Sequence, residues 1–190
     1  MTRLLAVVGA VTPAGRLNAA VQHAVDEASA RPAVSVSLLN LADYKLSFAD
    51  GRPAERYLDD TPRVIAAVAE ADALLLASPV YRASFTGALK NLLDLVPVDG
   101  LRGKPVGIVA MGASLHHYLG VDWQLRAVLA WFGALVAPTS VYLDSSHFKD
   151  GKLADPGARA ALGELVTALL ALAACPRERL GPPPLASGRA

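Results

Sequence analysis

Cysteine, aromatic residues and charged residues are all scarce in this 190-residue chain. The single cysteine, Cys175, excludes an internal disulfide and offers no metal-ligand spacing, which favours a reducing compartment. Aromatic residues make up 6% of the chain and charged residues 18%, so the core must be built mainly from Ala, Leu and Val. A formal net charge of +1 creates no field that would attract nucleic acid. The composition therefore argues against a nucleic-acid-binding module.

Long apolar runs are missing as well. No segment approaches the roughly 18 consecutive apolar residues that a membrane-spanning helix needs. The first apolar run, residues 4–8, is too short for a signal peptide, and a turn follows it where a cleavage site would be. We therefore expect a cytoplasmic protein without membrane contact. We also expect one domain over residues 1–174 and a disordered tail over residues 175–190, which are rich in Pro, Gly and Arg.

The sequence does contain a regular alternation of apolar strands and amphipathic helices. Strands are predicted at residues 4–8, 33–41, 72–77, 104–110 and 135–143, and helices at residues 16–30, 61–70, 84–96, 115–132 and 156–174. Residues 42–58 and 144–154 are polar and read as loops. This alternation predicts an α/β fold with a parallel sheet between two layers of helices. Such sheets bind ligands outside the carboxyl ends of their strands, here near Gly9, Ser78 and Met111.

The first of these turns, "GAVTPAGRLNAA", is neither a dinucleotide fingerprint nor a P-loop. It still offers the open N–H groups of a helix start, the Thr12 hydroxyl and the Arg16 guanidinium. Together these donors can hold one phosphate group. An ordinary strand-to-helix turn with a solvated arginine is the alternative interpretation.

The second turn lies in "ASPVYRASF". Because Pro79 has no N–H, we expect it to end the strand and leave the N–H groups of Val80 and Tyr81 open at the sheet edge. Tyr81 could equally be plain cover for that edge. In the following helix, Lys90 and Asp94 are expected to form an i,i+4 pair on a solvated face.

The third turn begins "AMGASLHHYLGVDW". Gly112 permits a close backbone approach, and Ser114 is expected to cap the next helix. His116 and His117 have no acidic residue or cysteine at ligand spacing, so no metal site is predicted; one of them is expected near a ligand. No catalytic elbow such as G-x-S-x-G is present. With no strong side-chain catalyst in view, a cofactor is expected to carry the reaction.

Two stretches resemble a known family. "ASPVYRASFTGALKNLLDLVP", followed by "LRGKPVGIVAMGAS", resembles the NADPH-dependent FMN reductase family, and "HHYLGVDWQLRAVLAWFGA" resembles its alkanesulfonate and methanesulfonate FMN reductase branch. The resemblance implies a flavodoxin-like three-layer sandwich with a parallel five-stranded sheet of order 2-1-3-4-5. It also implies hydride transfer from NADPH or NADH to FMN, with no catalytic side chain and no metal.

The resemblance also assigns a role to each turn. The first turn would hold the FMN phosphate, the second would lie along the isoalloxazine ring, and the third would meet the pyrimidine side of that ring. The implied cofactor-binding residues are Thr12, Gly15, Arg16, Leu17, Pro79, Val80, Tyr81, Arg82, Gly112, Ala113, Ser114 and His117. The first turn departs from the family, since Ala10, Gly15 and Leu17 stand where hydroxyl residues are expected. Fewer hydroxyl donors should weaken phosphate binding.

The same resemblance implies partners. A homodimer or homotetramer is expected, with Tyr118, Trp123 and Trp131 as interface candidates; ordinary core packing of these three side chains is the alternative. Trp123 also stands where the sulfonate branch often carries an inserted tyrosine that widens a helical turn. A flavin-dependent monooxygenase would receive the reduced flavin. Two alternatives are a reductase of quinones, azo dyes or metal oxyanions that keeps FMN bound, and a flavin-binding electron carrier or redox sensor without turnover.

Overall fold

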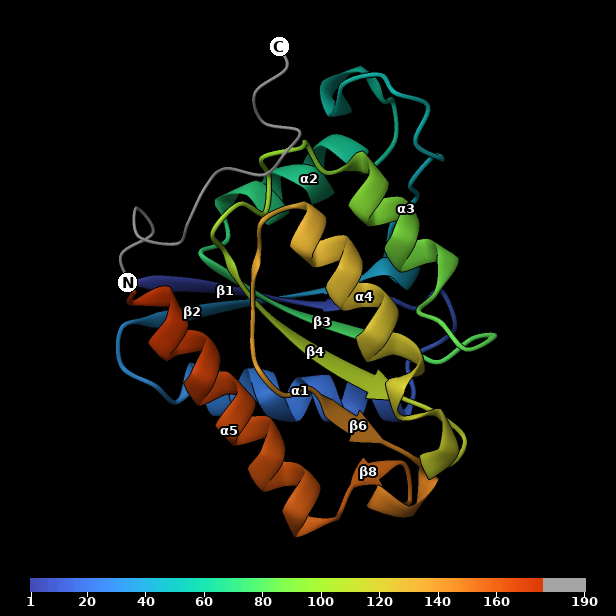
Figure 1. Ribbon diagram of the computed structural model, residues 1–190, viewed down its shortest axis with the longest axis vertical. Coiled ribbons are helices and arrows are strands. Elements are labelled where there is room, and N and C mark those ends of the chain that lie inside the picture. Colours follow the sequence, from blue (N-terminus) through green and yellow to red (C-terminus); the bar gives the residue numbers. More distant parts are fainter. Residues whose placement is uncertain (176–190) are drawn as a thin grey trace.

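The structure, a computed structural model, describes residues 1–175 and has three layers with a parallel sheet in the middle (Figure 1). The strands of the main sheet are β1 (Thr2–Val8), β2 (Val34–Asn40), β3 (Ala73–Pro79), β4 (Pro105–Met111), β5 (Leu135–Val136) and β6 (Val141–Leu143). Their order is β2-β1-β3-β4-β5, and β6 also pairs with β4. The predicted order 2-1-3-4-5 is confirmed.

Helices cover both faces of the sheet. The helix α1 (Arg16–Ser29) and the helix α5 (Pro156–Ala173) pack on one face. The other face carries α2 (Thr61–Glu70), α3 (Gly87–Leu95) and α4 (Leu119–Trp131), which Figure 1 shows together above the sheet. Each face has its own core of Leu, Val and Ala side chains, as the composition predicts.

Four single turns of 3₁₀ helix stand between these elements. They are η1 (Leu41–Asp43), η2 (Ala54–Arg56), η3 (Leu115–His117) and η4 (Ser145–His147). The prediction of one helix over residues 115–132 is therefore wrong at its start, because η3 precedes α4. Around Trp123 the chain is regular α-helix. The helix predicted from residue 84 begins at Gly87, because the Thr86 hydroxyl caps it by accepting the N–H of Leu89 at 3.1 Å.

The fifth strand is not continuous over residues 135–143 as predicted. It is divided into β5 and β6, with Pro138 in the gap. Arg126 of α4 provides the reason, since its guanidinium donates to the carbonyl oxygens of Ala137 at 2.9 Å and Pro138 at 3.2 Å. These carbonyls face a helix and not a neighbouring strand.

The polar loop predicted over residues 144–154 contains a small antiparallel hairpin. Its strands are β7 (Phe148–Lys149) and β8 (Lys152–Leu153). Asp150 and Gly151 form its turn with φ angles of 50° and 75°. Both angles are left-handed, as two-residue hairpin turns require.

The C-terminal helix α5 is long and apolar enough, by length and composition, to cross a membrane. Its buried side chains pack into the core between α5 and the sheet: Ala158, Leu162, Leu165, Val166 and Leu169. Cys175 is exposed and its thiol is free. The rest of the predicted tail lies outside the described residues, so the domain boundary near residue 174 stays a prediction.

Candidate functional site

The three turns singled out in the sequence meet at one edge of the sheet, where β1, β3 and β4 end. Val80 donates its N–H to the carbonyl of Met111 at 2.8 Å, which joins the second turn to the third. The Thr86 hydroxyl, which is 4% exposed, donates to the carbonyl of Gly9 and joins the second turn to the first. Ser78 is fully buried and accepts the N–H of Thr86 at 3.1 Å. The rim is therefore one connected unit.

The first turn is exposed and leaves helix donors open. Gly15 occupies the N-cap of α1, and having no side chain it caps none of the first-turn N–H groups. Thr12 and Arg16 are exposed beside these groups. The Leu17 side chain is 7% exposed and belongs to the core. Leu17 can contribute to a ligand only through its backbone.

A hollow of about 610 Å³ lies beside this turn. Its lining residues come from the turn, from α1, from β2 and from the β7–β8 hairpin: Ala14, Gly15, Arg16, Asn18, Ala19, Gln22, Leu38, Asp150, Gly151 and Lys152. The open N–H groups and the Arg16 guanidinium beside this hollow, with the exposed Thr12 hydroxyl in the same turn, form a donor set suited to a phosphate.

The second turn corrects the prediction about its backbone. Pro79 is the last residue of β3 and still pairs with Met111 of β4, so the strand ends at the proline as predicted. An N–H group at Pro79 would point to the same side of β3 as the carbonyl of Ala77, which faces β1. Because β1 has already ended at Val8, this side needs no donor at Pro79. The proline therefore costs the sheet no hydrogen bond. The N–H groups of Val80 and Tyr81 are not open, since they donate to Met111 and to Ser84.

The open donors lie one step further along the chain. Tyr81 and Ser84 form a two-way bridge with N···O distances of 2.8 and 3.0 Å. Between them, Arg82 and Ala83 have φ angles of 51° and 61°. Within residues 1–175, no hydrogen bond leaves the N–H group of either residue. Tyr81 and Arg82 are exposed, so their side chains remain available to a ligand.

The third turn is shaped by a tyrosine that sequence reasoning missed. A Cβ atom at Gly112 would lie 2.0 Å from the Tyr142 hydroxyl, so the glycine makes room for this side chain. Tyr142 donates to the carbonyl of Ser114 at 2.6 Å. Burial, and then the charge of Asp144, raise the pKa of Tyr142, which keeps the phenol as a donor. The space that Gly112 leaves is occupied by Tyr142 of β6, and the approach of a ligand to this glycine stays a prediction.

The remaining predicted residues of the third turn lie at the surface. Ser114 does not cap a helix through its side chain; its hydroxyl lies 3.3 Å from Nδ1 of His117 and 3.5 Å from Nδ1 of His116. Ala113 and His117 are exposed. No group of His, Cys, Asp or Glu that could hold a metal ion occurs in the part of the chain that the structure describes.

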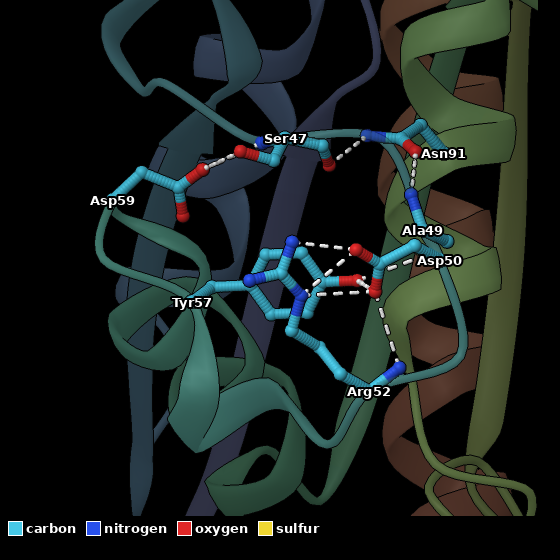
Figure 2. Close-up of polar contacts among 7 residues, drawn as sticks. All are labelled: Ser47, Ala49, Asp50, Arg52, Tyr57, Asp59 and Asn91. Atoms are coloured by element: carbon cyan, nitrogen blue, oxygen red, sulfur yellow. Dashed lines mark hydrogen bonds and ion pairs between the residues drawn. The ribbon is translucent and has the colours of Figure 1, made fainter.

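Beside the rim, the polar segment after β2 is held by a dense set of contacts (Figure 2). The Asn91 side chain of α3 accepts the N–H of Ala49 and donates to the carbonyl of Ser47, both at 3.0 Å. Asp59 accepts the backbone N–H and the hydroxyl of Ser47, each at 2.6 Å. Hydrogen bonds led by that hydroxyl hold the pKa of Asp59 well below its usual range.

A second set of contacts fixes the far half of this segment (Figure 2). Asp50 accepts from the guanidinium of Arg52 and from the hydroxyl of Tyr57, the latter at 2.9 Å. The Arg52 guanidinium stacks 4.5 Å from the centre of the Tyr57 ring. Phe48 lies in the segment that these contacts hold, and its side chain is 84% exposed. It lines an apolar hollow of about 360 Å³ together with Val11 of the first turn.

Four residues important to the rim were not among those predicted. Ser78 and Thr86 are buried hydroxyl residues in the quoted second stretch, and the position of a threonine directly before a helical pattern could have identified Thr86. Tyr142 and Gln124 act from β6 and α4 on turns that are distant in the sequence. No local pattern signals such contacts.

Solved structures place this fold among the flavodoxin-like α/β proteins. An NADH:FMN oxidoreductase in its apo form superposes with a TM-score of 0.76 at 25% identity, covering 94% of each chain. A WrbA-like flavodoxin from Agrobacterium tumefaciens superposes with a TM-score of 0.61 at 16% identity, covering 90% of this chain and 99% of the other. The second likeness concerns the fold alone. The predicted flavodoxin-like class is confirmed.

Sequence comparison identifies the family within that class. The profile of the NADPH-dependent FMN reductase family matches residues 2–148. An NAD(P)H-dependent FAD/FMN reductase of Geobacillus thermodenitrificans is 42% identical over 135 residues, 70% of this chain and 73% of the relative. The NADH-dependent FMN reductase SfnF of Pseudomonas putida is 34% identical over 155 residues, 81% and 83%. The chain belongs to the NADPH-dependent FMN reductase family, as predicted, and is an oxidoreductase.

Proposed function

We propose that this protein transfers a hydride from NADPH or NADH to FMN that it binds as an exchangeable substrate. The observation that carries the proposal is the connected rim, where three turns offer phosphate donors at one end and open backbone at the other. Membership of a family of NADPH-dependent FMN reductases supports the activity itself. The exchangeable binding is inferred from the first turn.

The phosphate would be held at the start of α1. Its donors are the uncapped N–H groups after Gly15, the Thr12 hydroxyl and the Arg16 guanidinium. The helix dipole adds to this attraction, since its positive end faces the anion. Because all of these groups are exposed, the site can release the nucleotide. This favours a substrate flavin over a permanently bound one.

The ring would lie against the second and third turns. At the end of β3 and in the turn after it, the supporting residues would be Pro79, Val80, Tyr81 and Arg82. After β4 they would be Gly112, Ala113, Ser114 and His117. When bound, FMN accepts the hydride, so the chain's own task is to orient two rings and exclude other geometries. That task fits a rim with backbone donors and no paired acid and base.

The proposal extends to the oligomeric state of the protein, its partner enzyme and its location in the cell. The protein would form a homodimer or homotetramer through α4, where Tyr118, Trp123 and Trp131 are 51%, 76% and 53% exposed. Reduced FMN would pass to a flavin-dependent monooxygenase. A cytoplasmic location would keep the single exposed thiol of Cys175 reduced.

Oxidation of NADPH and NADH, followed at 340 nm with and without added FMN, tests the activity. The proposal requires flavin-dependent turnover with at least one of the two cofactors, and its absence with both would refute it. Protein that purifies with stoichiometric FMN would point instead to the alternative reductase that keeps its flavin and reduces another acceptor.

A variant tests the phosphate site separately. Arg16→Ala should weaken FMN binding by roughly 10-fold, the loss of one charge-assisted hydrogen bond, and leave riboflavin binding unchanged because riboflavin lacks the phosphate. Fluorescence titration of both flavins gives the comparison. Equal weakening for FMN and riboflavin would remove Arg16 from the phosphate site. Arg31→Ala, at an exposed arginine after α1, serves as the control.

A further inference from the structure

A side chain of α4 holds the turn after β3. The Gln124 amide donates to the carbonyl of Ala83 at 2.9 Å and accepts from the Ser84 hydroxyl at 2.5 Å. Resting on the proposed function, we infer that Gln124 is a positioning residue for flavin reduction. It keeps the turn of residues 81–84 in the conformation that receives the flavin ring, without itself being a catalytic residue.

The turn needs such support because its sequence does not favour its shape. Arg82 and Ala83 both have left-handed backbone angles, with φ of 51° and 61°. Two-residue turns of this geometry normally carry Asn-Gly or Asp-Gly, since L-residues with a Cβ atom are disfavoured there. The chain itself uses Asp150-Gly151 in its other hairpin turn. Arg-Ala therefore depends on contacts from outside the turn.

Those contacts come from one face of α4. Gly120 lies one helical turn before Gln124, and a Cβ atom added there would lie 3.1 Å from the Val80 side chain and 3.4 Å from the carbonyl oxygen of Ala83. The missing side chain lets α4 approach closely enough for the Gln124 amide to reach the turn. Gln124 is itself exposed, so its loss leaves no buried polar group without a partner. Its effect should therefore fall on the shape of the turn more than on global stability.

The shape of the turn determines which donors face a ligand. The N–H groups of Arg82 and Ala83 make no hydrogen bond within residues 1–175, and their direction follows from the left-handed angles. Without the amide the turn would populate other conformations, and the apparent dissociation constant rises as the competent fraction falls. Saturating flavin restores the competent conformation. KM for FMN should therefore rise while kcat stays near its wild-type value.

The test replaces Gln124 with leucine, which keeps the bulk of the side chain and removes both hydrogen bonds. We expect KM and the dissociation constant for FMN to rise roughly 3- to 30-fold, the range for losing one or two ordinary hydrogen bonds. The thermal midpoint should change little. Lys90→Leu is the control, because the Lys90 ammonium bonds to Asp94 on the same helix and lies outside the three turns. An unchanged KM in Gln124→Leu would overturn the inference.

A second substitution separates positioning from other roles. Ala83→Gly removes the conformational penalty at the left-handed position, so in the Gln124→Leu background it should recover most of the lost FMN affinity. Failure of this rescue would also overturn the inference. Turnover by the wild-type protein separates a failure of the proposed function from a failure of the role of Gln124. Without flavin-dependent turnover the proposed function fails, whereas an active wild type with an unchanged KM for FMN in Gln124→Leu contradicts only the role of Gln124.

Discussion

At the scale of single residues, Thr86 carries more structure than its size suggests. Its hydroxyl donates to the carbonyl of Gly9 and accepts the N–H of Leu89, so one side chain joins two turns and caps α3. Gly9 could not carry a side chain here, since a Cβ atom would lie 2.8 Å from that of Leu89. The tight approach of the first turn to α3 thus depends on both residues.

We predict that Thr86→Val lowers the free energy of unfolding by about 1–3 kcal/mol, because it removes a cap and leaves a buried carbonyl without its donor. Urea denaturation measures the change. Thr167→Val is the control, since the exposed Thr167 hydroxyl donates within its own helix and accepts from the exposed Arg31 guanidinium. The prediction fails if the two variants lose similar stability.

A second prediction at the scale of single residues concerns Arg82 and the choice between NADPH and NADH. Its side chain is exposed on the second turn, where the extra phosphate of NADPH could pair with it. We predict that Arg82→Ala raises KM for NADPH by roughly 10-fold and leaves KM for NADH unchanged. Steady-state kinetics with both cofactors decides the matter, and equal effects on the two would exclude this role.

At the scale of elements, the end of α2 relies on a buried lysine. Lys104 is 8% exposed, and its ammonium donates to the carbonyls of Val68 and Ala69 at 2.8 and 2.7 Å. These carbonyls belong to the last turn of α2, where a positive charge is favoured. The residue before β4 therefore secures a helix that lies more than thirty residues earlier.

Lys104→Met should destabilise the protein by about 1–3 kcal/mol, because the helix loses its charged partner while the apolar stem is replaced. Lys90→Met is the matched control, since the exposed pair of Lys90 and Asp94 is worth only about 0.3–0.5 kcal/mol. Chemical denaturation of both variants tests the contrast. Comparable losses would mean that Lys104 does not cap α2.

The segment between β2 and α2 makes stability depend on pH. The pKa of Asp59 is lowered by the hydrogen bonds from Ser47, so the folded state prefers the charged carboxylate. This contribution is complete above the unfolded pKa of about 3.9 and is lost as the pH falls below it. We predict that the stability difference between wild type and Asp59→Asn shrinks from pH 6 to pH 3. Urea titrations across this range would contradict the prediction if the difference stayed constant.

At the scale of the whole molecule, the outer face of α4 is a candidate subunit interface. Its inner face packs on the sheet and holds the second turn, while Trp123 and Trp131 remain exposed. Large exposed aromatic side chains on one helix are typical of protein contacts. If oligomers form through this face, Trp123→Glu should shift the mass measured by light scattering toward the monomer. Leu38→Glu, on the edge strand β2, should leave the mass unchanged.

Much of the architecture followed from local pattern. Apolar runs separated by helical periods predicted the parallel sheet, and the quoted turn stretches predicted which strand ends would meet. The prediction of one continuous fifth strand is wrong, because the break at Pro138 depends on Arg126 of α4. The prediction puts the open N–H groups at Val80 and Tyr81, two positions too early, because Val80 donates to Met111 and Tyr81 donates to Ser84.

The sequence by itself determined the α/β class and the position of the three turns, since these depend on periodicity and on residues close together in the chain. The flavodoxin-like fold and the sheet order came from the resemblance to a known family. Only the tertiary structure decided the form of the site. Gln124 reaches Ala83 across 41 residues, and Tyr142 reaches Ser114 across 28. Such contacts arise when packed elements bring distant side chains together. These contacts depend on how the elements pack, and packing between distant elements leaves no periodic pattern in the sequence.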